Sequence, residues 1–136
     1  MIAPYIGFNG RCREAMSFYA EVFGATDLTF STFGEAPPMP GMDPAMKDQI
    51  MHSEMTIGGS KLMGADGPTS VLGQGSVVSV MHGPKDGPSG QAVFDRLAEG
   101  GEVVMPYQKT FWSEGFGMVK DRFGISWMIS APGAAG

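Results

Sequence analysis

Three polar side chains of this 136-residue chain are candidates for acid–base chemistry: His52, Glu54 and Glu114. His52 and Glu54 stand two positions apart in the segment 50–57. If this segment is a strand, alternation puts both on one face and its apolar residues on the other. There His52 can serve as a general base, with Glu54 setting its charge state. Both residues also suit an ordinary polar strand face, and Glu114 suits a surface carboxylate, so these interpretations stay open.

A second set of side chains could line a binding pocket, because aromatic and methionine groups make good walls for an apolar or planar ligand. Its members are Tyr5, Met63, Trp112, Phe116 and Met128. Alternation groups Trp127 with apolar neighbours and predicts that it lies in the core. Met128 then shares the opposite face with Ser126 and Ser130. Trp112 and Phe116 suit a core equally well.

The composition is that of one small folded domain, with 43% apolar and 17% charged residues. A net charge of −5 argues against a nucleic-acid partner, which would favour a basic stripe. A single cysteine, Cys12, excludes an internal disulfide, and its place on an apolar helix stripe predicts a core residue. No apolar run approaches the roughly 18 residues of a membrane span, and the first residues do not resemble a signal peptide. We therefore expect a cytoplasmic protein without membrane contact.

Apolar periodicity and turn residues predict two helices among eight strands. The first helix covers 12–23, with Asn9 or Gly10 as its cap, and the second opens at Ser89 or Gly90. The predicted strands cover 2–8, 27–33, 49–57, 60–65, 77–81, 102–109, 113–120 and 125–130.

The order of these elements is β-α-β-β-β, and it occurs twice in succession along the chain. Each helix has an aromatic residue six positions before its final glycine, Phe18 before Gly24 and Phe94 before Gly100. Such a repeat indicates a single α+β domain over 1–136 that is built from tandem modules. The expected boundaries are about 1–66 for the first module, about 76–131 for the second, and 34–48 for a proline-rich insertion loop in the first.

Three motifs carry a family resemblance: PYIGFNG at 4–10, MHSEMTIGG at 51–59 and TFWSEGFGMVKDRFG at 110–124. They resemble the PhnB-like branch of the vicinal-oxygen-chelate superfamily, to which glyoxalases, bleomycin-resistance proteins and extradiol dioxygenases belong. The resemblance covers 4–129. It implies two βαβββ modules whose mixed sheets curl into a cup, and a homodimer with pockets at the module or subunit seam.

In metal-dependent members of the superfamily, His and Glu side chains hold a divalent ion that acts as a Lewis acid. The resemblance places the corresponding positions at Pro4 or Tyr5, near Met63, within 76–78 and near Met128. These side chains do not supply the imidazole or hard oxygen ligands that such an ion needs. We therefore expect neither the usual metal site nor a cofactor. A divalent ion held by His52, Glu54 and Glu114 is the alternative.

Relatives in this branch often carry the label 3-demethylubiquinone-9 3-methyltransferase. The sequence does not support it, because no glycine-rich loop joins a strand to a helix as in typical S-adenosylmethionine enzymes. Two functions remain open. The first is metal-free binding of a small apolar or aromatic molecule in the cup at the dimer seam. The second is a divalent-metal lyase, isomerase or dioxygenase with a non-standard site; a structural protein with a vestigial cup is a third reading.

Overall fold

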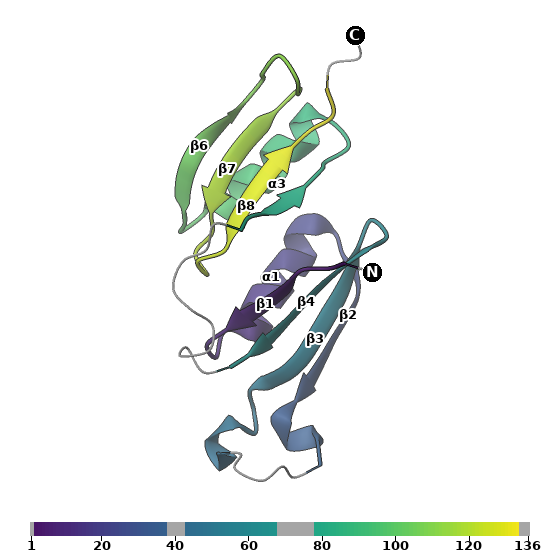
Figure 1. Cartoon of the computed structure of the whole chain (residues 1–136), viewed down its shortest axis with the longest axis vertical. Coiled ribbons are helices and arrows are strands. Elements are labelled where there is room, and N and C mark those ends of the chain that lie inside the picture. Colours follow the sequence, from purple (N-terminus) through teal and green to yellow (C-terminus); the bar gives the residue numbers. More distant parts are fainter. Residues whose placement is uncertain (1, 38–42, 68–77, 134–136) are drawn as a thin grey trace. The chain divides into compact units, whose positions relative to one another are not determined.

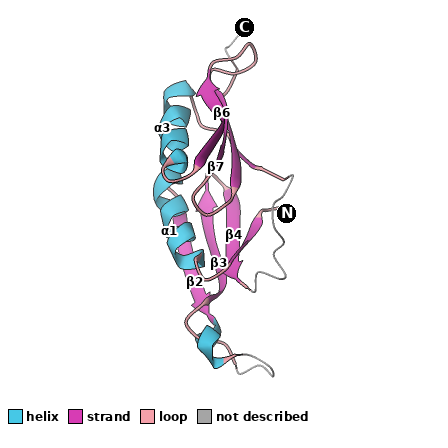
Figure 2. Ribbon diagram, turned by 90° about the vertical axis from the view of Figure 1, so that its left-hand side faces the viewer, coloured by secondary structure: helices cyan, strands magenta, loops and turns pink. Residues whose placement is uncertain are grey.

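The computed structural model describes residues 2–37, 43–67 and 78–133, which belong to two compact units, Met1–Gln74 and Gly75–Gly136. Each unit contains a four-stranded mixed sheet with a helix packed along one face (Figure 1, Figure 2). Neither sheet is closed. The predicted α+β class and the β-α-β-β-β order of elements are therefore confirmed for the described chain.

Sheet A, in the first unit, has the strand order β1-β4-β3-β2. The β1–β4 pair is parallel and the other pairs are antiparallel. Helix α1 packs against β2, β3 and β4, and we call the other side the open face of sheet A. The elements are β1 (Tyr5–Phe8), α1 (Cys12–Phe23), β2 (Thr26–Thr32), β3 (Ile50–Ile57) and β4 (Ser60–Asp66).

Sheet B, in the second unit, has the strand order β5-β8-β7-β6, again with one parallel pair, β5–β8. Helix α3 packs against β6, β7 and β8, and the other side is the open face of sheet B. The elements are β5 (Val80–His82), α3 (Gly87–Ala98), β6 (Glu102–Gln108), β7 (Phe116–Lys120) and β8 (Ser126–Ser130). In the described parts of the chain, no helix has the length and apolar character needed to cross a bilayer.

The apolar stripe of α1 forms the core of the first unit. Cys12, Met16 and Tyr19 are fully buried on the helix, and Met55 and Leu62, which pair directly across β3 and β4, are buried in the sheet. Burial raises the pKa of the Cys12 thiol to about 11, so it is uncharged at neutral pH. The prediction that Cys12 is a core residue is confirmed.

The start of α1 is held by a carboxylate from a distant strand. Asp66, at the end of β4, accepts hydrogen bonds from the backbone N–H groups of Cys12 and Ile50, each at 3.0 Å. The predicted caps, Asn9 and Gly10, are wrong, because the helix begins after Arg11, which makes no side-chain cap. Asp66 therefore satisfies the first turn of α1 and the beginning of β3 at once.

The proline-rich loop departs from its prediction, which was a segment without regular structure. Two short 3-10 helices occur here, Pro44–Met46 inside the loop and Phe33–Glu35 at its start, where Phe33 is predicted to end the strand that in fact ends at Thr32. Proline opens the helix inside the loop because the missing N–H of Pro44 would have no partner in a helix start, and the Asp43 side chain accepts from the N–H of Ala45. Residues 38–42 of this loop lie outside the described residues.

Several predicted boundaries in the second unit differ from the structure: β6 and β8 are each one residue shorter than predicted, and larger differences involve α3, β7 and β5. Helix α3 starts at Gly87, ahead of Ser89, because the Asp86 carboxylate accepts from the N–H of Ser89 and Pro88 occupies the first turn. Strand β7 starts at Phe116, and the residues before it are held by the Ser113 hydroxyl, which contacts the carbonyls of Gly115 and Ala131, the latter directly after β8. Strand β5 extends to His82, and residue 77 of its predicted range lies outside the described residues.

The side chain of Tyr107, on β6, occupies space that two glycines leave open, and a third glycine lies against its backbone. Its hydroxyl donates a 2.7 Å hydrogen bond to the carbonyl of Gly87 at the start of α3. A β-carbon on Gly90 or Gly115 would collide with the tyrosine side chain, and one on Gly117 would collide with the Tyr107 backbone. The glycines of this unit therefore make the close approach of β6 to α3 possible.

We predict that Asp66→Ala lowers the free energy of unfolding by about 2–4 kcal/mol, because two buried N–H groups lose their acceptor and each costs about 1–3 kcal/mol. Asp66→Asn, which keeps one acceptor oxygen, should lose less. Urea unfolding followed by circular dichroism measures both. Asp43→Ala is the matched control, since it removes an exposed carboxylate that caps an exposed turn; an equal loss in this control would contradict the assignment.

Candidate functional site

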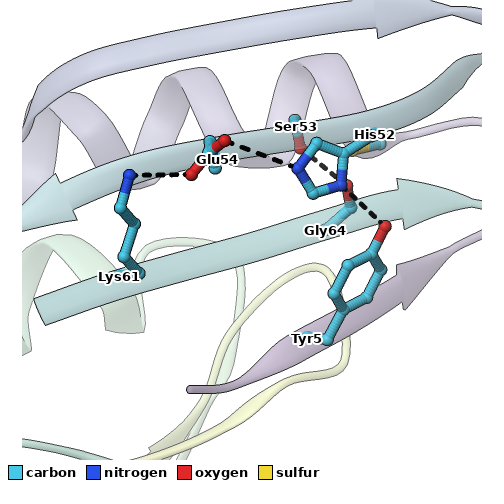
Figure 3. Close-up of polar contacts among 7 residues, drawn as sticks. Tyr5, His52, Ser53, Glu54, Lys61 and Gly64 are labelled. Atoms are coloured by element: carbon cyan, nitrogen blue, oxygen red, sulfur yellow. Dashed lines mark hydrogen bonds and ion pairs between the residues drawn. The ribbon is translucent and has the colours of Figure 1, made fainter. Parts of the chain in front are cut away.

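The open face of sheet A carries a chain of contacting polar side chains (Figure 3). The Tyr5 hydroxyl lies 3.0 Å from Nδ1 of His52, and Nε2 of His52 lies 3.7 Å from Oε1 of Glu54. Lys61 Nζ donates to Oε2 of Glu54 at 2.8 Å. The predicted sharing of one strand face by His52 and Glu54 is confirmed, and the intervening Ser53 is buried on the helix side.

Three neighbouring strands position this chain. Strand β4 lies between β1 and β3, so the Tyr5 side chain reaches across β4 to His52, with ring centroids 5.7 Å apart. Met63 pairs with both Tyr5 and Glu54 and so lies beside the chain, on the same open face. The predicted site residues Tyr5, His52, Glu54 and Met63 are thus brought together.

The contacts of His52 are compatible with a triad-like arrangement in one tautomer of the imidazole. When His52 is neutral with its proton on Nε2, the Tyr5 hydroxyl donates to Nδ1 and the Nε2–H faces Glu54. Carboxylate, imidazole and hydroxyl then follow one another in the order used by acid–base triads. Burial raises the pKa of the Tyr5 hydroxyl, so at neutral pH it remains protonated and acts as a donor.

Lys61 sets the charge of Glu54. The Lys61 hydrogen bond and positive charge lower the pKa of the Glu54 carboxyl, with a smaller contribution from His52, and Glu54 in turn raises the pKa of Lys61. Glu54 is therefore ionised at neutral pH, and Lys61, more than His52, supplies the positive charge that balances it.

Lys61 was missed by the sequence analysis, although a signal for it exists. The predicted hairpin about Gly58 and Gly59 pairs Thr56 with Lys61. Counting outward from the turn puts Lys61 on the face of Thr56 and Glu54, one diagonal step from the carboxylate.

The open face of sheet B is apolar where that of sheet A is polar. Met105, Met118, Met128 and Met81 are direct neighbours on four successive strands, β6, β7, β8 and β5. We call this set the methionine row. The residues on either side of Met118 and Met128 are buried toward α3, which leaves the row on the open face. Met81 is 65% exposed and Met105 43% exposed.

Aromatic side chains extend this apolar surface. Phe116 stands two residues before Met118 on β7 and therefore shares its face. The Trp112 ring packs edge-on against Phe116, with centroids 5.7 Å apart, and Phe111 packs against Trp112. Trp112 is half exposed, so it lies at the surface and not in the core, the alternative that the sequence left open. Trp127 is buried on the helix side, which confirms its assignment to the core.

Glu114 has a local partner in the second unit. Its carboxylate accepts a 3.3 Å hydrogen bond from the N–H of Gly87, the first residue of α3. A carboxylate at this place satisfies a free N–H group and faces the positive end of the helix dipole. Through this contact Glu114 stabilises the start of α3, and its acid–base role remains a prediction.

The side chains at the expected metal positions do not fit a hard divalent ion. Tyr5 offers a protonated phenol, and Met63 and Met128 offer thioethers, which hard cations disfavour. In the described ranges, no three His, Cys, Asp or Glu side chains are grouped so that they could hold a metal ion. Glu54 has Lys61 as its second neighbour, and a cation there would compete with that ammonium.

Comparisons with known proteins agree with this fold. The family model described as 3-demethylubiquinone-9 3-methyltransferase matches residues 1–130. Protein YjdN of Escherichia coli (strain K12) is 33% identical over 138 residues, which cover 95% of this chain and 93% of YjdN.

Two solved structures are also similar. The crystal structure of protein PA1353 from Pseudomonas aeruginosa is 36% identical with a TM-score of 0.85, and the match covers 97% of each chain. A putative 3-demethylubiquinone-9 3-methyltransferase, PhnB protein, from Bacillus cereus is 22% identical with a TM-score of 0.75, covering 96% of this chain and 98% of the other. Structural neighbours share the glyoxalase/bleomycin-resistance fold, which confirms the predicted architecture.

We predict that Lys61→Met raises the pKa of Glu54 toward its ordinary value, because Lys61 is the main cause of the lowered pKa. An NMR titration of the Glu54 side-chain carboxyl carbon measures the change. Lys47→Met removes a charge of the same unit outside the polar chain and should leave this pKa unaltered. An unchanged Glu54 pKa in Lys61→Met would contradict the pairing.

Proposed function

The chain belongs to the family described as 3-demethylubiquinone-9 3-methyltransferase, whose members include PhnB-like proteins, and we propose that it binds a small apolar or aromatic molecule without the usual metal site. The observation that carries this proposal is the open face of sheet B. Its methionine row and the adjoining Phe116 and Trp112 form an apolar surface in which Met81, Met105 and Trp112 are exposed. Exposed apolar surface of this kind marks binding sites.

The types of side chain in this surface suit a planar or apolar ligand. Methionine side chains are flexible and polarisable, and they contact aromatic rings favourably. Trp112 and Phe116 add two ring faces or edges for stacking. Lys120, Ser126 and Ser130 are the polar residues that share this face of β7 and β8, and they can orient a ligand that the rings and thioethers hold.

We also propose a homodimer, because the edge strand β6 is poorly protected. Val103 and Val104 are exposed on this strand, which has a neighbour on one side only. An exposed apolar edge strand invites pairing with another chain. A second copy of the chain would shield it and enclose the ligand surface from bulk water.

Methyl transfer, the activity in the family's description, is not part of this proposal. Sheets A and B are largely antiparallel, with a single parallel pair in each. The parallel, doubly wound sheet with a glycine-rich turn that typically binds dinucleotide-like cofactors is a different architecture.

An acid–base enzyme is the second candidate, and the Tyr5–His52–Glu54 chain favours it. In this alternative His52 accepts a proton and Tyr5 donates one, with or without a divalent ion at a non-standard site. Metal analysis of protein purified without chelators tests the metal-dependent form. Stoichiometric Mn, Fe, Ni or Zn that is lost in His52→Ala would support it, and a metal-free protein with no metal-dependent thermal shift would rule it out.

For the binding function, we predict that small aromatic compounds perturb the open face of sheet B selectively. With methyl-labelled methionine, the NMR signals of Met118 and Met128 should shift on titration with 1-anilinonaphthalene-8-sulfonate and related aromatics. The signals of Met16 and Met55, which are buried in the first unit, should not move. Phe116→Ala should weaken binding about tenfold, since it removes an apolar ring contact worth about 1.5 kcal/mol.

Fluorescence supplies the matched control. Trp112 is at the proposed surface and Trp127 is buried on the helix side. Ligand should change the emission of the native chain, whereas in Trp112→Phe the remaining Trp127 emission should stay constant while the methionine signals still shift. Shifts confined to first-unit methionines, or no shifts at all, would contradict the proposal.

A further inference from the structure

We propose that the methionine row is a binding site for a soft monovalent metal cation, with Cu(I) as the ion that its chemistry favours. The row holds four thioethers in direct register, Met105 with Met118, Met118 with Met128, and Met128 with Met81. The proposed function assigns the same face to an organic ligand. The metal site is a separate proposal, because it is argued from the sulfur donors and not from the apolar surface.

Strand pairing places methionine side chains side by side on one face. Met118 and Met128 are direct partners across β7 and β8, and directly paired residues have β-carbons about 4.5–5.5 Å apart. Methionine side chains are unbranched and flexible, so the two sulfur atoms can turn toward one ion between them. Met105 or Met81, one strand farther out, supplies a third sulfur through its flexible side chain.

The donor set decides which ion is preferred. Thioethers are soft and uncharged, and in proteins they select Cu(I), whereas Mg²⁺, Ca²⁺ and Mn²⁺ require oxygen ligands. Along β7 the row is flanked by Phe116 and Lys120, and along β8 by Ser126 and Ser130, whose uncharged hydroxyls suit a soft ion less well than thioethers do. A monovalent ion also adds the least charge to an apolar surface, which keeps the desolvation cost low.

The exposure of the methionine row distinguishes it from methionines that only fill space in a core. Methionine is a common gap filler inside proteins, but Met81 and Met105 expose 65% and 43% of their surface. These two side chains can therefore be reached by an ion arriving from solvent. The free thiol, Cys12, is fully buried and its pKa is raised to about 11, so it is no rival site in the folded protein.

The test is an anaerobic titration of the intact chain with Cu(I) in competition with bathocuproine disulfonate. We expect about one ion per chain and a sulfur-only first shell in X-ray absorption. Met118→Leu/Met128→Leu removes two sulfurs while conserving volume and apolar character. It should weaken Cu(I) binding by at least about tenfold. Met63→Leu, on the open face of sheet A, and Cys12→Ala should bind as the native chain does.

These variants keep the metal and ligand proposals distinguishable. Leucine keeps the apolar area but not the sulfur, so in the double variant Cu(I) binding should fall by at least about tenfold while binding of 1-anilinonaphthalene-8-sulfonate falls less. Met81→Leu, a change at an exposed position, provides a second variant if the double one is unstable. Nitrogen or oxygen ligands in the absorption spectrum, or native affinity for Cu(I) in both Met81→Leu and the double variant, would overturn the metal site and leave the ligand proposal intact.

Discussion

One buried carboxylate organises the first unit. Asp66 ends β4, accepts the N–H of Cys12 at the start of α1, and accepts the N–H of Ile50 at the start of β3. It thereby joins three elements at a single point. Because side chains alternate along β3, fixing where that strand starts also fixes which residues meet the helix. Ser53 and Met55 are directed inward, and His52 and Glu54 remain on the open face as a result.

Much of the fold is predictable from local pattern. The stripe of Cys12, Met16 and Tyr19 predicts a helix with a buried face, and alternation predicts that Trp127 is in the core. What local pattern misses is the long-range partner. The acceptor of the Cys12 N–H group lies 54 residues away in sequence, and no residue near Cys12 indicates it. The start of α3 is likewise set by Asp86 and Pro88, whose capping role overrides the simpler reading of Ser89 as the first residue.

The candidate sites show the same division. Alternation alone brings His52 and Glu54 to one face, and it leaves Met128 opposite Trp127. It does not reveal that Met128 has methionine neighbours on both sides, because the register between strands depends on turn lengths and on the irregularities in β6. To predict which residues are neighbours across a sheet, the register of every strand pair must be known. To predict which residues share a face of one strand, the alternation within that strand is enough.

The fit of Tyr107 among Gly90, Gly115 and Gly117 has a consequence for how this unit can change over evolutionary time. A side chain at Gly90 or Gly115 would overlap the Tyr107 side chain, whereas one at Gly117 would overlap Phe94 and the Tyr107 backbone, which no change of the Tyr107 side chain relieves. Positions 90, 107 and 115 therefore form one mutational unit that spans a helix, a strand and a loop. Aligned relatives should vary at these three positions together, with a smaller residue at 107 wherever Gly90 or Gly115 has been lost.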